Sequence, residues 1–82
     1  GYWAEVILHA DREGHFIRLD IDEEFSISHV VQTDLWVKEG DKVSSFKGAN
    51  DAIGTLVLRF DSEKELIAGM KNLDALITVV VQ

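Results

Sequence analysis

The sequence predicts an α+β domain, in which a mainly antiparallel sheet of about five strands carries one main helix, residues 62–75, on one face. Three observations lead to this prediction. Several short segments alternate apolar and polar residues or are rich in β-branched residues. One later segment has apolar residues at helical spacing. Short glycine-containing turns separate the strands. The 82 residues suit one domain, spanning 1–82, with room for little more than one sheet and one or two helices.

The first half of the chain predicts three strands. Residues 2–10 and residues 15–21 are separated by the turn 11–14, which ends in a glycine, so we expect them to form an antiparallel hairpin. Residues 22–26 are acidic and fit either a loop or a single helical turn. Residues 27–37 alternate again and predict a third strand, long enough to contain a bulge.

The second half predicts a strand, a helix and a closing strand. Residues 55–60 (TLVLRF) form a short apolar strand, and Ser62 with Glu65 has the spacing of a capping box that begins a helix. The apolar residues expected to lie together on the packed face of this helix are Leu66, Ile67, Met70 and Leu73. Residues 77–81 (ITVVV) are β-branched and predict the last strand.

Composition excludes several classes of function. The formal net charge of −7 would repel nucleic acid and anionic membranes, and the absence of cysteine rules out disulfides and thiolate metal sites. No apolar stretch approaches the roughly 20 residues of a membrane helix, and no signal peptide is recognisable, so we expect a cytoplasmic protein with no nucleic-acid or membrane partner. Because the chain begins at Gly1 rather than methionine, we expect a processed or excised piece of a larger protein.

Motifs that carry chemistry are missing. The chain has no nucleophile elbow, phosphate-binding loop or dinucleotide fingerprint. His9 and His15 flank one turn and could hold a metal with Asp11 or Glu13, but histidines that face solvent explain the pattern better. We therefore predict no catalytic, cofactor-binding or metal-binding residues in this chain.

Two features predict contact with a neighbouring domain or its substrate. The irregular loop 44–54 is long for so short a chain, and such loops are often functional, although a plain crossover connection is the alternative. Its candidate contact residues are Phe46, Lys47, Gly48, Asn50 and Asp51. The open face of the sheet is expected to carry Trp3, Glu5, Arg18 and Trp36, and two exposed tryptophans would favour a buried interdomain face.

Several segments resemble the C-terminal domain of ATP-grasp ligases. Residues 37–43 (VKEGDKV) resemble its V-x-x-G-D-x-V turn, residues 4–8 (AEVIL) its first strand, and residues 53–62 (IGTLVLRFDS) its glycine-preceded strand and the start of its helix. The resemblance spans residues 4 to 73, and its motifs are short. The nearest families are the carboxylate–amine ligases, of which L-amino-acid ligases are one type, and more remotely biotin carboxylase.

The resemblance implies an accessory part of a larger enzyme. In that family, ATP and magnesium bind in preceding domains, which this sequence lacks, and the C-terminal domain packs on the catalytic core and helps wall the substrate cleft. The expected partner is therefore the rest of a parent ligase chain, and no cofactor is expected in this fragment. The alternative is a stand-alone interaction or regulatory module that forms a homodimer through the open sheet face, aided by an exposed edge at residues 77–81.

Overall fold

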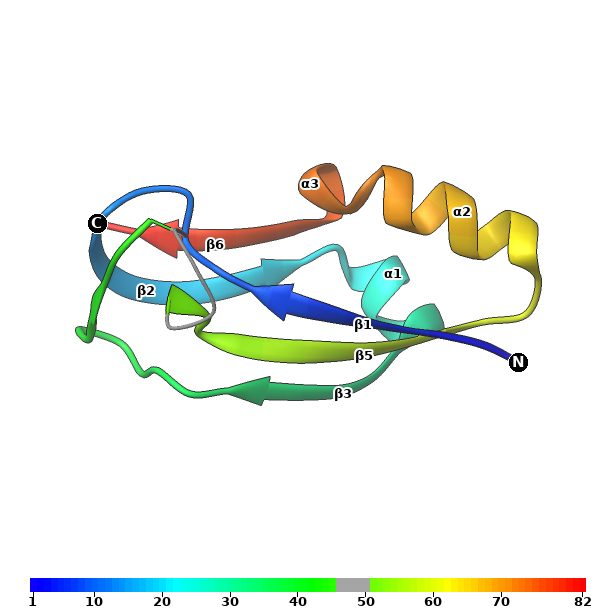
Figure 1. Ribbon diagram of the computed structural model, residues 1–82, viewed down its shortest axis with the longest axis horizontal. Helices are drawn as coiled ribbons and strands as arrows, with labels where there is room; N and C mark the ends of the chain where they lie inside the picture. Colours follow the sequence, from blue (N-terminus) through cyan, green and yellow to red (C-terminus); the bar gives the residue numbers. More distant parts are fainter. Residues whose placement is uncertain (46–50) are drawn as a thin grey trace.

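The computed structural model describes residues 1–45 and 51–82, in which six strands and three short helices follow one another (Figure 1). In chain order the elements are β1 (Tyr2–Leu8), β2 (Gly14–Ile21), α1 (Glu23–His29), β3 (Val30–Leu35), β4 (Lys42–Val43), β5 (Gly54–Phe60), α2 (Glu63–Lys71), α3 (Leu73–Leu76) and β6 (Ile77–Val81). Among these residues, no helix has the length and apolar character that a membrane crossing would require.

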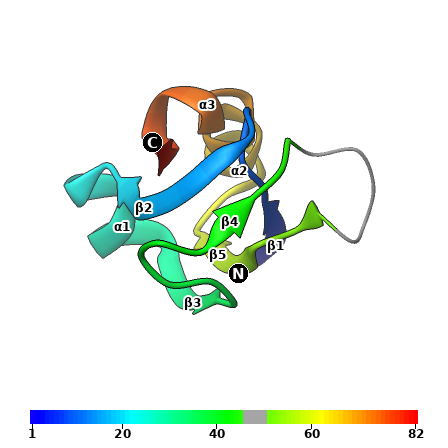
Figure 2. The ribbon, with the colours of Figure 1, turned by 90° about the vertical axis from the view of Figure 1, so that its left-hand side faces the viewer.

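The strands form two three-stranded sheets, with orders β1-β5-β3 and β4-β2-β6, and all strand pairs are antiparallel. The α+β class and the antiparallel pairing are confirmed, but a division into two sheets replaces the single sheet that we expected. Figure 2, which looks along the strands, shows β2 and β6 on one side of the interior and β1, β5 and β3 on the other.

The predicted hairpin between the first two strands is wrong, because β1 pairs with β5 and β2 pairs with β4 and β6. The reason lies in the connection after β1. Ala10 is completely buried and forms an isolated parallel bridge with Ser45, so the chain passes through the core there and enters the other sheet. A glycine-containing turn was compatible with a hairpin but did not determine the strand partner.

The hydrophobic core lies between the two sheets. Strand β5 is the middle strand of its sheet, and its inward-facing residues Leu56, Leu58 and Phe60 are the most completely buried large side chains. The other buried apolar residues are Leu8, Ala10, Phe16, Phe25, Val43, Ile53 and Val81. The core therefore draws on both sheets and on α1, and β5 contributes its centre.

A β-bulge in β2 changes which of its residues face the core. Strict alternation along residues 15–21 predicts Ile17 on the same face as Leu19 and Ile21, but the register with β6 shifts between Phe16 and Arg18. Phe16 is consequently buried, while Leu19 and Ile21 remain partly buried. The extra residue of a bulge reverses the alternation along the strand, so strict period-2 assignment fails at this point.

The expected strand 27–37 begins later than predicted, because α1 extends to His29 and β3 starts at Val30. The carboxylate of Asp22 accepts a hydrogen bond from the backbone N–H of Phe25 at 3.0 Å, which satisfies the first turn of the helix. Phe25 is buried, and its ring centroid lies 6.2 Å from that of Phe60. Burial of one aromatic side chain therefore stabilises a helix within a segment whose alternation suggested a strand.

The predicted helix 62–75 is divided at Asn72 into α2 and α3. The capping interaction is confirmed, because Ser62 Oγ accepts a hydrogen bond from the Glu65 N–H at 3.2 Å. The predicted packed face is only partly correct. Leu66 and Leu73 are partly buried against the core, but Ile67 is 59% exposed and Met70 is 38% exposed.

Candidate functional site

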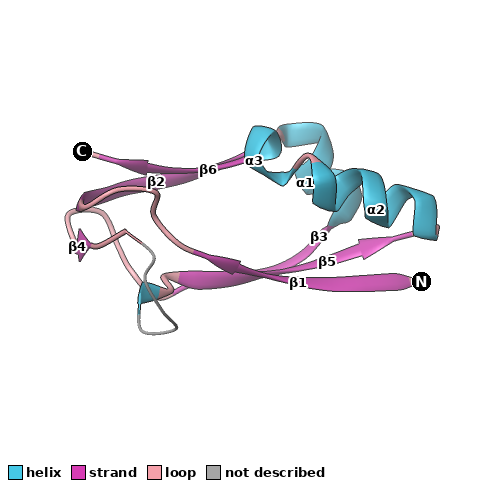
Figure 3. Cartoon of the chain, turned by 45° about the horizontal axis from the view of Figure 1, so that its top comes forward, coloured by secondary structure: helices cyan, strands magenta, loops and turns pink. Residues whose placement is uncertain are grey.

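One face of the sheet β1-β5-β3 carries no described element. Figure 3 shows the second sheet and the helices on the same side of this sheet, so its other side, here called the outer face, points away from the core. Along β5, every second residue faces the core, and the residues between them face outward. These outward-facing residues and their paired residues on β1 and β3 make up the outer face. These residues are Trp3, Glu5, Ile7, Gln32, Asp34, Thr55, Val57 and Arg59.

The outer face combines apolar and charged side chains. Trp3 lies opposite Arg59, Glu5 lies opposite Val57, and Trp3 and Ile7 are 58% and 54% exposed. A tryptophan and an isoleucine in one strand, exposed beside an arginine, have the composition of the centre of many protein interfaces. This face is therefore a candidate docking surface.

The two tryptophans lie at opposite ends of this sheet. Trp3 is paired with Arg59, whereas the Trp36 N–H donates to the carbonyl of Ile53 at 2.8 Å. Six residues of extended chain separate these two partners, which corresponds to roughly 20 Å at about 3.3 Å per residue. Trp36 is 62% exposed. Both tryptophans are thus accessible, but they mark two ends of a surface and not a single aromatic cluster.

Arg18 was expected on the same open face and does not lie there. It belongs to β2, in the other sheet, where its Nε donates to the carboxylate of Asp20 at 2.9 Å. Both side chains are largely exposed, so this ion pair contributes little to stability. The error follows from the wrong strand partner for β2, because a residue can share a face with Trp3 only if its strand belongs to the same sheet.

Four of the five candidate contact residues of the loop lie outside the described residues. Phe46, Lys47, Gly48 and Asn50 fall in this part of the chain. Asp51 is described and lies, half-buried, just before Ile53 and the start of β5. The contact role predicted for the loop remains a prediction.

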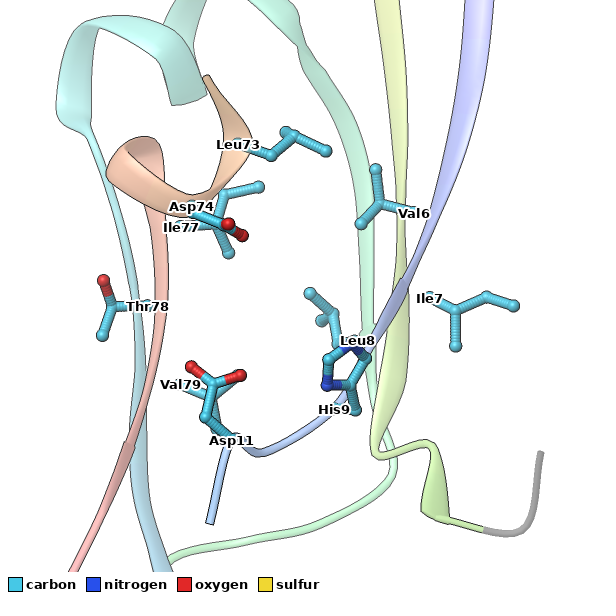
Figure 4. Close-up of a pocket in the computed structure, with 10 residues that line it drawn as sticks. All are labelled: Val6, Ile7, Leu8, His9, Asp11, Leu73, Asp74, Ile77, Thr78 and Val79. Atoms are coloured by element: carbon cyan, nitrogen blue, oxygen red, sulfur yellow. The ribbon is translucent and has the colours of Figure 1, made fainter. Parts of the chain in front are cut away.

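The described residues also form a cavity of about 250 Å³ where β1 faces α3 and β6 (Figure 4). Strand β1 pairs only with β5, and β6 pairs only with β2, so each of these strands is an edge of its sheet within the described residues. The lining residues are Val6, Ile7, Leu8, His9, Asp11, Leu73, Asp74, Ile77, Thr78 and Val79. The cavity is thus the opening left between the edges of the two sheets.

The histidines do not form the metal site that was considered. His9 lines the cavity with Asp11, whereas His15 lies on β2 opposite Lys42. Residues 1–45 and 51–82 contain no group of three or more histidine, aspartate or glutamate side chains arranged to hold a metal ion.

His29 has a structural position that the strand pattern of residues 27–37 does not predict. It ends α1, and its ring stacks on that of Phe60, with centroids 4.5 Å apart and planes 29° apart. Its Nδ1 lies 3.0 Å from the carbonyl oxygen of Arg59. The spacing of Phe25 and His29, four residues apart on one helix, was the available signal once the helix was recognised.

Comparison with known proteins identifies the fold. No protein-family model and no curated protein sequence matches the chain. An L-amino acid ligase from Bacillus licheniformis has a similar structure, with a TM-score of 0.76 and 20% sequence identity over 98% of this chain and 20% of the ligase. A phosphoribosylglycinamide synthetase from Anaerococcus prevotii has a TM-score of 0.69 and 12% identity, also over 98% of this chain and 20% of that chain.

The chain shares its fold with part of two ATP-grasp ligases. The resemblance inferred from residues 4–8, 37–43 and 53–62 is therefore confirmed at the level of fold. The chain spans about a fifth of the length of each of these enzymes.

Proposed function

We propose that this chain is an accessory domain of an ATP-grasp-type, ATP-dependent ligase. In this proposal the domain packs on the catalytic core, helps wall the substrate cleft, and has no catalytic activity alone. The observation that carries the proposal is the match of nearly the whole chain to only a fifth of each of two ligases. A domain that recurs as one part of such enzymes is expected to depend on the remainder for their chemistry.

The chemistry of the cavity supports an accessory role. The charged residues that line the cavity are Asp11 and Asp74, with no lysine or arginine. Carboxylates repel phosphate oxygens, whereas nucleotide sites present lysine, arginine or backbone N–H groups to them. We therefore expect ATP and magnesium to bind in other domains of the parent chain.

The outer face supports docking to those domains. Trp3 and Ile7 are more than half exposed on a sheet face that no described element covers, and Arg59 lies beside Trp3. Tryptophan and arginine are the residues that most often dominate binding energy at interfaces. In the proposed parent protein, the catalytic core covers this face, and the whole enzyme works in the cytoplasm.

Calorimetric titration of the isolated chain with MgATP tests the proposal. We expect no binding heat above dilution at ATP concentrations up to several millimolar. Tight, magnesium-dependent binding would overturn the proposal, because the nucleotide site would then lie within these residues. The reading frame that contains this chain should also encode an ATP-grasp core, and a frame restricted to these 82 residues would count against it.

A second candidate function is a stand-alone interaction module that forms a homodimer. The specific observation in its favour is that β6, with the sequence ITVVV, is an edge strand of the sheet β4-β2-β6. Exposed edges with β-branched residues can pair with a second copy. Sedimentation equilibrium separates the two candidates, because a strict monomer at high concentration excludes the dimer.

A further inference from the structure

The cavity between β1 and β6 has two chemically different parts. Figure 4 shows Val6 and Leu8 of β1 pointing toward Leu73 and Ile77, which lie across the cavity on α3 and at the start of β6. These four side chains form an apolar wall. His9, Asp11 and Asp74 lie along the border of the same space, so a ligand there would meet an apolar surface and a polar margin together.

The charged residues on the polar margin of the cavity are both acidic. Asp11 and Asp74 come from distant parts of the sequence, and no lysine or arginine lines the cavity. Arg12, the residue after Asp11, donates a hydrogen bond to the backbone carbonyl of Val81 at the end of β6. Arg12 keeps its positive charge, but it does not line the cavity, so the two carboxylates are the charged groups of the lining that a ligand would meet. Ionised carboxylates accept hydrogen bonds and attract cations.

The size and arrangement of the cavity favour an organic ligand over a bare metal ion. A volume of about 250 Å³ has room for roughly eight water molecules at about 30 Å³ each. The described residues do not bring three potential metal ligands together. An apolar wall also gives no advantage to a hydrated ion, whereas it would contact a hydrocarbon stem.

We propose that this cavity binds a small organic cation, with an ammonium or guanidinium group on a short aliphatic stem. The charged head lies at the carboxylates of Asp11 and Asp74, and the stem packs on Val6, Leu8 and Ile77. Of the residues that line this site, only Ile7 also belongs to the outer face, and the inference does not rest on the proposed ligase function. It would hold for the isolated chain whether or not a parent enzyme exists.

NMR titration of the ¹⁵N-labelled chain with n-butylammonium chloride tests the proposal, with n-butanol and butyrate as probes of matched size. At constant ionic strength, we expect butylammonium to shift the amide signals of Val6, Leu8 and Ile77 in a saturable way at millimolar concentration. We expect weaker shifts from butanol and none from butyrate. Equal shifts from butanol and butylammonium would overturn the proposal, because the carboxylates would then have no role.

Matched variants locate the binding site. Asp74→Asn and Asp11→Asn should each weaken butylammonium binding about threefold, the effect expected when one partner of a solvent-exposed ion pair is lost. Glu39→Gln changes the net charge equally but alters a residue that does not line the cavity, so it should leave binding unchanged. Thr78→Val should also have little effect, because Figure 4 shows the Thr78 side chain pointing away from the cavity.

The spectra of the variants also report whether each one is folded, so loss of structure is distinguished from loss of binding. If Glu39→Gln weakens binding as much as Asp74→Asn, the attraction is a general effect of the acidic surface and the proposal fails. If neither aspartate variant weakens binding, the proposal also fails.

Discussion

Gly69 of α2 lies against the ring of Phe60, so closely that a Cβ atom at position 69 would be 2.7 Å from Cε1 and 2.9 Å from Cζ of that ring. The helix contains no buried residue, yet it packs on the sheet through this contact and through the partly buried Leu66. A glycine within a helix costs about 1 kcal/mol relative to alanine. Here the missing side chain is what allows the helix to approach β5.

Gly69→Ala should destabilise the fold despite its better helix propensity. Phe60 is almost completely buried and cannot move aside, so the added methyl group overpacks the core at a cost of roughly 1–3 kcal/mol. We expect a net loss of about 1–2 kcal/mol in the free energy of unfolding, measured by urea denaturation. Gly69→Ala at or above wild-type stability would contradict the described packing. The double variant Phe60→Leu/Gly69→Ala should lose less stability than the sum of its single changes.

Gly54→Ala should be more damaging, because its neighbours are backbone atoms. A Cβ at position 54 would lie 2.2 Å from the carbonyl oxygen of Asp34 and 3.1 Å from Cα of Leu35, so β3 could not remain paired with β5. We expect a loss of about 3 kcal/mol or more, beyond the usual cost of overpacking.

Gly40→Ala is the control for the Gly54 variant. Gly40 has a φ of 95° with nothing within 4 Å of a built Cβ, so alanine there meets only backbone strain of roughly 1–2 kcal/mol. Thermal unfolding of both variants should rank Gly54→Ala as the less stable. The reverse order would contradict the close approach of β3 to Gly54.

The N-terminal cap of α2 provides a test in which the expected change in stability is smaller and comes from one hydrogen bond. Ser62 Oγ accepts from the N–H of Glu65, and the Asp61 N–H donates to Glu65 Oε2, both at 3.2 Å. Ser62→Ala removes the first of these bonds and should cost about 1 kcal/mol. Ser62→Asp keeps an acceptor at the helix N-terminus and should retain most of the stability. Equal stability of the alanine and aspartate variants in urea would show that the cap is unimportant.

The outer face should matter for association more than for folding. Trp3→Ala removes a side chain that is more than half exposed, so the isolated chain should lose less than about 1 kcal/mol. Leu58→Ala, in the core, should lose roughly 2–5 kcal/mol. In the proposed parent ligase, Trp3→Ala should weaken docking of the domain and lower ATP-dependent turnover. If the Trp3→Ala enzyme keeps its full turnover while removal of the whole domain abolishes it, the domain docks through another face.

Local features of this fold could be predicted from the sequence because they depend on neighbouring residues. The TLVLRF segment does form a strand, the ITVVV segment does form the last strand, and Ser62 does cap a helix. In each case the decisive interaction lies within a few residues, or the side-chain pattern itself reflects burial. The exposure of Trp3 could also be predicted, because its strand has one face toward the core and one face that is uncovered.

Strand partners and the extent of α1 could not be predicted, because they depend on contacts between distant residues. Burial of Ala10 sends the chain into the second sheet, and burial of Phe25 against Phe60 stabilises a helix where alternation suggested a strand. The cavity was missed for the same reason. Its two acidic residues, Asp11 and Asp74, approach the same space only after β1 and β6 become the facing edges of two sheets.

Reconstitution of the parent enzyme from two pieces tests the proposed function most directly. The remainder of the reading frame would be produced without residues 1–82, the chain would be added separately, and ADP release would be measured with a carboxylate, an amine and MgATP. We predict that the remainder has little activity alone, that the added chain restores activity saturably, and that the Trp3→Ala chain requires a higher concentration. Full activity of the remainder without the chain, or ATP turnover by the chain alone, would contradict an accessory role.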